Sequence, residues 1–156
     1  MKESKDIKVL IPDENYQIIE FNQEEKYGIA FINTALQSNE LKEVFCWNCS
    51  ILLELENTTE NGMPLEDDFI ILDDFEDYLD GNVKGENKEK PNALFFGRIT
   101  WNSTRQLIWK VFNPEITNDF LEKLIESENY PFEFDYRIEE DEDWQLTKWY
   151  YENIEK

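Results

Sequence analysis

A change of hydrophobic period between two neighbouring segments constrains the fold of this chain more than any other feature of its sequence. Residues 44–56 alternate between apolar and polar side chains, which is typical of a β-strand with one buried face. Residues 65–80 instead place apolar side chains at steps of three and four, which predicts a helix with a single apolar stripe. The stripe consists of Leu65, Phe69, Leu72, Phe75 and Leu79. A strand followed by an amphipathic helix indicates a domain that mixes both kinds of element.

The segments after residue 92 predict a hairpin and a second helix. Ala93–Thr100 and Arg105–Phe112 are β-type runs joined by a short polar turn. Asn113 followed by Pro114 is typical of a helix start, because asparagine caps the free N–H groups and proline suits the first helical position. Apolar residues then recur at helical spacing up to Leu124.

The two ends of the chain predict further elements. Tyr16–Phe21 and Tyr27–Ile32 form an expected N-terminal hairpin. Residues 132–139 alternate as a last strand, and the aromatic end of the chain predicts a short C-terminal helix that Asp141 or Asp143 would cap.

From residue 44 onward the expected order is strand, helix, strand, strand, helix, strand. This order predicts an α+β fold of the ferredoxin-like, split β-α-β type: an antiparallel sheet with two helices on one face. The N-terminal hairpin and the C-terminal helix would extend it. We expect one domain over residues 1–156, with a core at about residues 15–154 and a mobile loop at residues 81–91.

The charge of the chain excludes several classes of function. The sequence has 36 acidic residues, 15 basic residues and no histidine, which gives a net charge of −21. Nucleic acids and anionic lipid surfaces are bound mainly through lysine and arginine, so we expect neither as a partner. Spread evenly over a domain of this size, the carboxylates would lie about 15 Å apart, well beyond the Debye length of about 8 Å at physiological salt. Only clustered acids would therefore produce a strong local field.

Two segments concentrate the acids and provide a candidate partner-binding surface. The first is the polar side of the predicted helix at residues 65–80, and the second is the five-acid run that precedes a tryptophan. The candidate residues are Asp73, Asp77, Asp80, Glu139, Glu140, Asp141, Glu142, Asp143 and Trp144. Such a surface would select a basic protein partner and accelerate its association.

The two cysteines, Cys46 and Cys49, form a C-x-x-C motif within the predicted strand. In a strand these positions lie about 10 Å apart and on opposite faces, too far for a disulfide. We expect two ordinary reduced thiols; a redox role, or a zinc site shared between two copies, is the alternative.

Sequence signals for catalysis are weak. The chain lacks histidine, a nucleophile motif and a phosphate-binding loop, and its acids match no EF-hand. We expect no cofactor and no metal. A carboxylate-based, Mg²⁺-assisted hydrolase remains the alternative, because two of the many acids could face each other across a cleft. No apolar run is long enough for a signal peptide or a membrane span, so we expect a cytoplasmic protein.

Three motifs in order resemble one protein family. They are Glu60-Asn61-Gly62-Met63-Pro64 before an acidic helix, Phe96-Gly97-Arg98-Ile99-Thr100 before a short turn into Arg105, and a last strand running into Glu142-Asp143-Trp144. Over about residues 16–154 the chain resembles the bacterial family called domain of unknown function 695, which implies no activity and no site residues. The family tends to place a glycine in the hairpin turn, where this chain has Asn102-Ser103.

In outline the chain is also similar to the family of regulators of ribonuclease E activity B, which are acidic inhibitors with a ferredoxin-like fold. This similarity rests on fold and charge alone. Together with the charge, it leads us to expect a non-enzymatic interaction or inhibitor module that acts on a basic partner, such as a nuclease inhibitor or an immunity-like protein.

Overall fold

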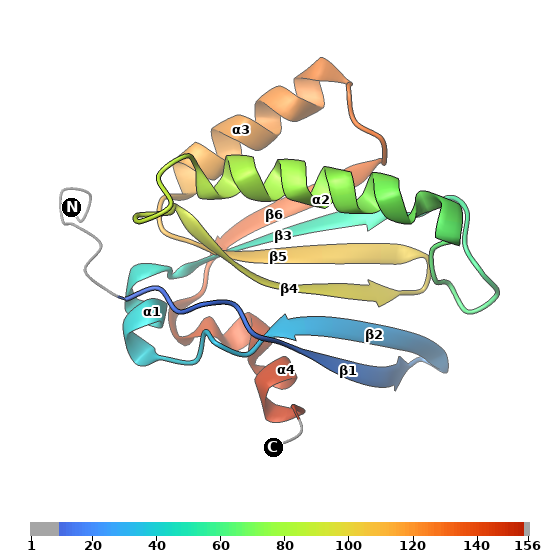
Figure 1. Cartoon of the computed structure of the whole chain (residues 1–156), viewed down its shortest axis with the longest axis horizontal. Coiled ribbons are helices and arrows are strands. Elements are labelled where there is room, and N and C mark those ends of the chain that lie inside the picture. Colours follow the sequence, from blue (N-terminus) through green and yellow to red (C-terminus); the bar gives the residue numbers. More distant parts are fainter. Residues whose placement is uncertain (1–9, 155–156) are drawn as a thin grey trace.

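The computed structural model describes residues 10–154, which fold around one six-stranded sheet (Figure 1). The strands are β1 (Tyr16–Gln23), β2 (Lys26–Asn33), β3 (Trp47–Glu54), β4 (Ala93–Trp101), β5 (Thr104–Val111) and β6 (Phe134–Glu140). They lie in the order β1-β2-β4-β5-β3-β6, and every neighbouring pair is antiparallel. The mixed α+β fold expected from the change of hydrophobic period is confirmed.

Helices cover both sides of this sheet (Figure 1). Within the described residues they are α1 (Asn39–Val44), η1 (Glu66–Asp68), α2 (Phe69–Lys84), α3 (Pro114–Ser127), η2 (Glu142–Thr147) and α4 (Lys148–Glu152), where η marks a 3₁₀ segment. The two long helices, α2 and α3, lie side by side on one face, η1 leads directly into α2, and α1, η2 and α4 lie at the other side. None of the helices in the described residues is long and apolar enough to cross a membrane.

The main core lies between the sheet and the two long helices. The alternation of β3 points Cys49, Ile51 and Leu53 toward these helices, and all three are fully buried. The predicted helix stripe meets them with Leu72, Phe75 and Leu79, whereas the first two stripe residues remain largely exposed. The α3 helix starts as predicted, because the Asn113 side chain accepts a hydrogen bond from the backbone N–H of Glu115.

A smaller core lies on the opposite face, below β2, β4 and β5. Phe95 and Phe96 are successive residues of β4, so Phe95 points toward the long helices and Phe96 points away from them. A bulge interrupts the register of β4 between Phe95 and Gly97. The ring of Tyr151 packs edge-on against Phe96, and its hydroxyl donates to the backbone oxygen of Asn33 at 3.1 Å. The C-terminal segment is thus held against the sheet.

Both tight hairpins use residues with positive φ. Glu24 and Glu25 join β1 to β2, and Asn102 and Ser103 join β4 to β5, all with φ between 51° and 65°. Two-residue turns of type I′ need positive φ at both positions, which asparagine tolerates better than most residues. This explains how Asn102-Ser103 can replace a turn that contains glycine.

Two boundaries differ from the sequence-based expectation. Strand β3 begins only at Trp47, because α1 occupies the preceding residues and starts at the N-cap Ser38, whose side chain accepts from the backbone N–H of Leu41. Helix α2 continues to Lys84, so the first four residues of the predicted loop 81–91 are helical; Gly85, with φ 85°, ends it.

The predicted C-terminal helix is divided into η2 and α4. Asp143 and Trp144 have left-handed φ values of 63° and 54° inside η2, so the backbone kinks there instead of forming one continuous helix. Of the two predicted caps, Asp141 and Asp143, the structure uses Asp141 as the N-cap of η2. Its side chain accepts a hydrogen bond from the backbone N–H of Gln145.

Candidate functional site

The two acidic segments identified from the sequence lie beside different core clusters. Asp73, Asp77 and Asp80 belong to α2, which packs on the main core. Residues 139–143 lead from β6 into η2, next to the separate cluster that contains Trp144. The structure therefore does not bring them together into one surface.

Trp144 is part of the core, which corrects its assignment to an exposed partner surface. Its side chain is only 2% exposed and packs with Leu36, Leu41 and Phe45. The indole Nε1–H donates to the backbone oxygen of Phe45 at 2.8 Å. The left-handed backbone at Asp143 and Trp144 accompanies this inward orientation of the ring.

Asp141 is also buried and is therefore withdrawn from the candidate surface. Its carboxylate accepts hydrogen bonds from the backbone N–H groups of Gln145 and Leu146, at 2.9 and 3.0 Å. The backbone N–H of Asp141 donates to the backbone oxygen of Cys46 at 2.8 Å. Asp141 thus ties the start of η2 to the sheet.

The other acids of this run are accessible. Glu140, Glu142 and Asp143 are exposed and line a small cleft of about 250 Å³ together with Lys42 and Glu43 of α1 and Cys46. Glu139 is half-buried and lies 3.9 Å from Arg137.

Lys110 is a buried charged residue that the sequence pattern did not single out. It is 0% exposed, its Nζ donates to the side-chain oxygen of Asn48 at 2.7 Å, and the nearest carboxylate oxygen, of Asp141, lies 3.9 Å away. The rings of Phe96 and Trp144 lie 5.0 and 5.1 Å from Nζ. Burial lowers the pKa of Lys110 from 10.5 to about 7, since the attraction of Asp141 only partly offsets the loss of hydration.

On α2, Asp80 is occupied by contacts within the protein. Its carboxylate accepts from the indole Nε1–H of buried Trp109 at 2.8 Å and pairs with Lys84 at 3.1 Å. Lys84 also reaches Glu14 at 3.1 Å. Asp80 therefore stabilises the packing of α2, whereas Asp73 and Asp77 are exposed and available.

A bidentate ion pair fixes the same helix to β4. Glu76 accepts two hydrogen bonds from Arg98, both at 2.8 Å. The neighbouring Arg105 donates through Nε to Thr100 at 3.2 Å, and burial lowers its pKa to about 10. These arginines lie between the helix and the sheet, so they leave the outer surface of α2 acidic.

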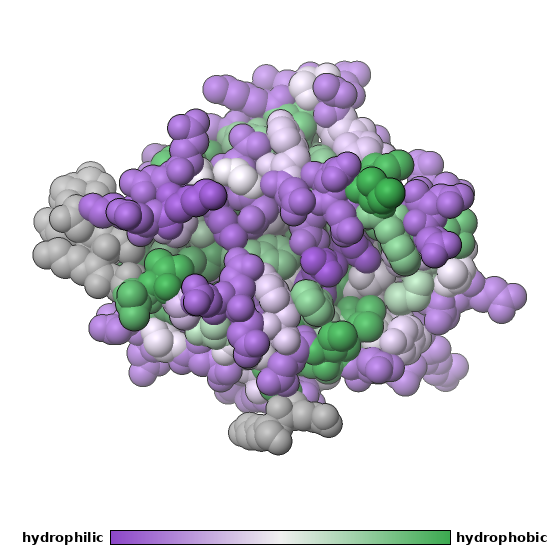
Figure 2. Space-filling view, viewed as in Figure 1, coloured by the Kyte–Doolittle hydropathy of each residue, from purple (hydrophilic) through white to green (hydrophobic). Residues whose placement is uncertain are grey.

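The outer surface formed by η1, α2 and α3 is rich in acidic residues. These three elements contain twelve acidic residues and two lysines. The exposed acids are Glu66, Asp67, Asp73, Asp74, Asp77, Glu115, Asp119, Glu122 and Glu126. The rings of Tyr78 and Phe120 meet at 5.8 Å between α2 and α3, so the two helices form one continuous surface, which we call the acidic helix layer. Figure 2 shows that this side of the molecule is mostly hydrophilic.

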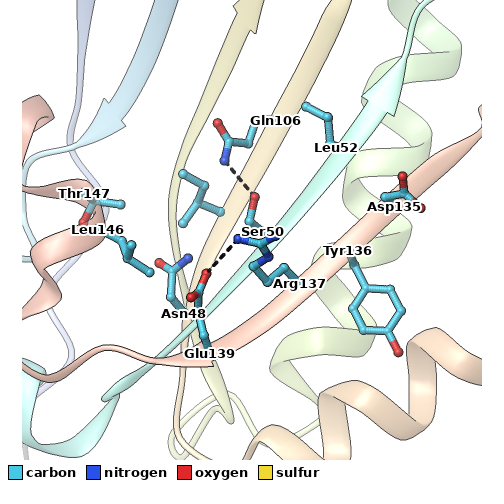
Figure 3. Close-up of a pocket in the computed structure, with 11 residues that line it drawn as sticks. Asn48, Ser50, Leu52, Gln106, Asp135, Tyr136, Arg137, Glu139, Leu146 and Thr147 are labelled. Carbon is cyan, nitrogen blue, oxygen red and sulfur yellow. Dashed lines mark hydrogen bonds and ion pairs between the residues drawn. The ribbon is translucent and has the colours of Figure 1, made fainter.

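A polar groove of about 480 Å³ opens on the sheet face opposite the long helices (Figure 3). Its floor is formed by β3, β5 and β6, where Ser50 accepts a hydrogen bond from Gln106 at 2.7 Å. The two carboxylates of its lining, Asp135 and Glu139, are four residues apart on one strand, or about 13 Å. Arg137 lies between them (Figure 3).

The described residues contain no group of three or more Cys, Asp or Glu side chains placed to hold a metal ion. Cys46 and Cys49 are both free thiols. Burial raises the pKa of the Cys49 thiol to about 12, which disfavours the reactive thiolate.

Comparisons with known proteins identify the family of the chain. No curated protein and no solved structure matches it. One family model, described as a family of unknown function (DUF695), matches residues 14–152, which include every strand and helix described above. The resemblance seen in the three sequence motifs is thereby confirmed, and the chain belongs to the DUF695 family.

Proposed function

We propose that this protein is a non-enzymatic interaction module that binds a basic protein through its acidic helix layer, in the manner of a nuclease inhibitor or an immunity protein. We place it in the cytoplasm, where its two free thiols would stay reduced. We further assign the last four strands and the two long helices to the ferredoxin-like fold. The strand order β4-β5-β3-β6, with both helices on one face, supports that assignment.

The concentration of exposed acids on one surface carries the functional proposal. Asp73 and Asp77 lie one helical turn apart, about 6 Å, with Asp74 beside them. This spacing is shorter than the Debye length of about 8 Å, so their fields add instead of being screened from one another. A field of one sign attracts a basic surface and repels nucleic acid and other acidic proteins.

Contacts inside the protein reduce the set of acids that we propose for this contact. Asp80, Asp141 and Trp144 are engaged inside the protein, so the proposed contact uses Asp73, Asp77 and the exposed acids beside them. The groove on the other face has two carboxylates in its lining, Asp135 and Glu139, and no specific observation favours the hydrolase alternative.

A charge-matched pair of variants tests the proposal. The helix variant is Asp73→Asn, Asp74→Asn and Asp77→Asn. The control removes three charges from the cleft beside α1, outside the acidic helix layer, with Glu140→Gln, Glu142→Gln and Asp143→Asn. Wild type and variants are immobilised and exposed to cell lysate at low and moderate salt. We expect wild type and control to retain the same basic protein at low salt and to release it as salt rises, and the helix variant to retain much less.

Loss of retention in both variants alike, or retention that ignores salt, would contradict binding by the acidic helix layer. Equal retention by all three proteins would do the same. Thermal melting of each variant checks that the fold is preserved.

A further inference from the structure

The first turn of α2, at one end of this helix, exposes three consecutive apolar side chains within the acidic helix layer. Phe69, Ile70 and Ile71 are 46%, 73% and 46% exposed. Successive helical residues are rotated by about 100°, so three in a row cannot all face the sheet. Leu72 takes the buried position and is 1% exposed, which leaves its three predecessors on the outside. We call Phe69, Ile70 and Ile71 the apolar patch.

Acids surround the apolar patch along the chain. Glu66, Asp67 and Asp68 precede it, and Asp73 and Asp74 follow it. The sequence contains no lysine or arginine between Lys42 and Lys84. Figure 2 shows a green area over the end of α2 at which the helix begins, next to hydrophilic side chains.

We propose that the apolar patch and its flanking acids together form the seat for a basic amphipathic segment of the partner, with an apolar residue placed on Ile70 and Ile71 and Lys or Arg residues placed over the acids. This inference rests on the proposed function and specifies the partner chemistry. Apolar contact supplies affinity through buried area, while the surrounding charges select the partner and set its register.

Charge complementarity decides between this occupant and a second copy of the chain. In a symmetric dimer the same surface of two copies would face each other. The acids that flank the apolar patch in one copy would then lie opposite the flanking acids of the other copy. Like charges placed opposite each other in an interface are costly, whereas a segment with alternating apolar and basic residues meets both features of the surface.

The test uses a fluorescent synthetic helix of leucine and lysine with its leucines at helical spacing, and a second peptide of the same composition in scrambled order. Binding is measured by anisotropy at several salt concentrations. We expect the amphipathic peptide to bind wild type at least several-fold more tightly than the scrambled one. Ile70→Gln with Ile71→Gln should weaken it about tenfold without changing the salt dependence.

The matched control is Ile116→Gln with Ile125→Gln on α3, where the side chains are 50% and 38% exposed. It makes the same chemical change on the same layer and should leave affinity unchanged. The triple variant of Asp73, Asp74 and Asp77 should instead reduce both the affinity and its salt dependence.

The outcomes separate the two proposals. If the aspartate variant weakens binding and the isoleucine variant does not, the acidic layer binds by charge alone and the apolar seat is refuted. If neither variant matters, or no peptide binds, both proposals fail. A concentration-dependent dimer in wild type that the isoleucine variant abolishes would assign the apolar patch to a second copy and overturn the inference.

Discussion

The burial of Lys110 leads to a testable prediction about how the stability of the fold depends on pH. The folded protein holds this lysine fully buried, hydrogen-bonded to Asn48 and 3.9 Å from Asp141, with the positive Lys42 opposing its charge. Its pKa is about 7 in the folded state and 10.5 when unfolded. Between these values the unfolded chain binds a proton that the folded protein does not, so the free energy of unfolding rises with pH.

The size of the effect follows from the two pKa values. Below pH 7 both states are protonated and the full cost of burying the charge is present, on the order of 5 kcal/mol. From about pH 7 to about pH 9 the cost should fall, and stability should rise by about 2 kcal/mol through Lys110 alone. The other titrating groups, such as Cys49, are common to wild type and variant and cancel in a comparison.

The assay is urea unfolding followed by tryptophan fluorescence at about pH 7 and about pH 9. In the Lys110→Met variant the free energy of unfolding should rise by about 2 kcal/mol less between these two pH values than it does in wild type. This expectation holds whatever the absolute stability of the variant. Lys123→Met removes an exposed lysine from α3 and should keep the wild-type pH dependence. If the free energy of unfolding of both the Lys110 and the Lys123 variant depends on pH as it does in wild type, the reasoning about the buried charge is refuted.

Three further substitutions test individual contacts by urea unfolding. Gly62→Ala should destabilise the fold by about 1–3 kcal/mol, because φ is 82° and the new Cβ would lie 2.8 Å from a backbone nitrogen of the adjacent hairpin turn. Unchanged stability would mean that this loop shifts freely. Trp144→Phe should lower the free energy of unfolding by about 1–3 kcal/mol, since it leaves the buried backbone oxygen of Phe45 without its hydrogen-bond donor. Unchanged stability would show that water replaces the indole as the donor. Arg98→Lys should cost about 1 kcal/mol, because lysine lacks the planar guanidinium that donates two parallel hydrogen bonds to Glu76. Full stability at low and high salt would argue against the bidentate pair.

The helices and strands that could be predicted are determined by residues close to one another in the sequence. The alternation around Ile51 and the three-four spacing around Phe75 reflect which side chains face the core, and both residues are buried as the pattern required. The cap at Asn113 is likewise decided by its own neighbours in the chain. The missed helix α1 had a comparable signal in Ser38, but it is short and was hidden by the alternating run that follows.

The candidate site was less predictable because exposure depends on distant segments. Asp141 and Trp144 read as part of an exposed acidic run, yet contacts with α1 and the sheet hold them inside. The apolar patch did have a sequence signal, since Ile70 and Ile71 fall outside the helical stripe. What the pattern could not indicate was that Phe69, a stripe residue, stays half exposed beside them.

The sequence by itself determined the acidity of the protein, the alternating strand and the amphipathic helix, because these depend on composition and on neighbours along the chain. Only the tertiary structure decided which charges are free. Asp77 remains in solvent, while Asp80, less than one turn further along the same helix, is occupied by Trp109 and Lys84. A carboxylate is available to a partner only if no donor from elsewhere in the fold reaches it, and that depends on how remote segments pack.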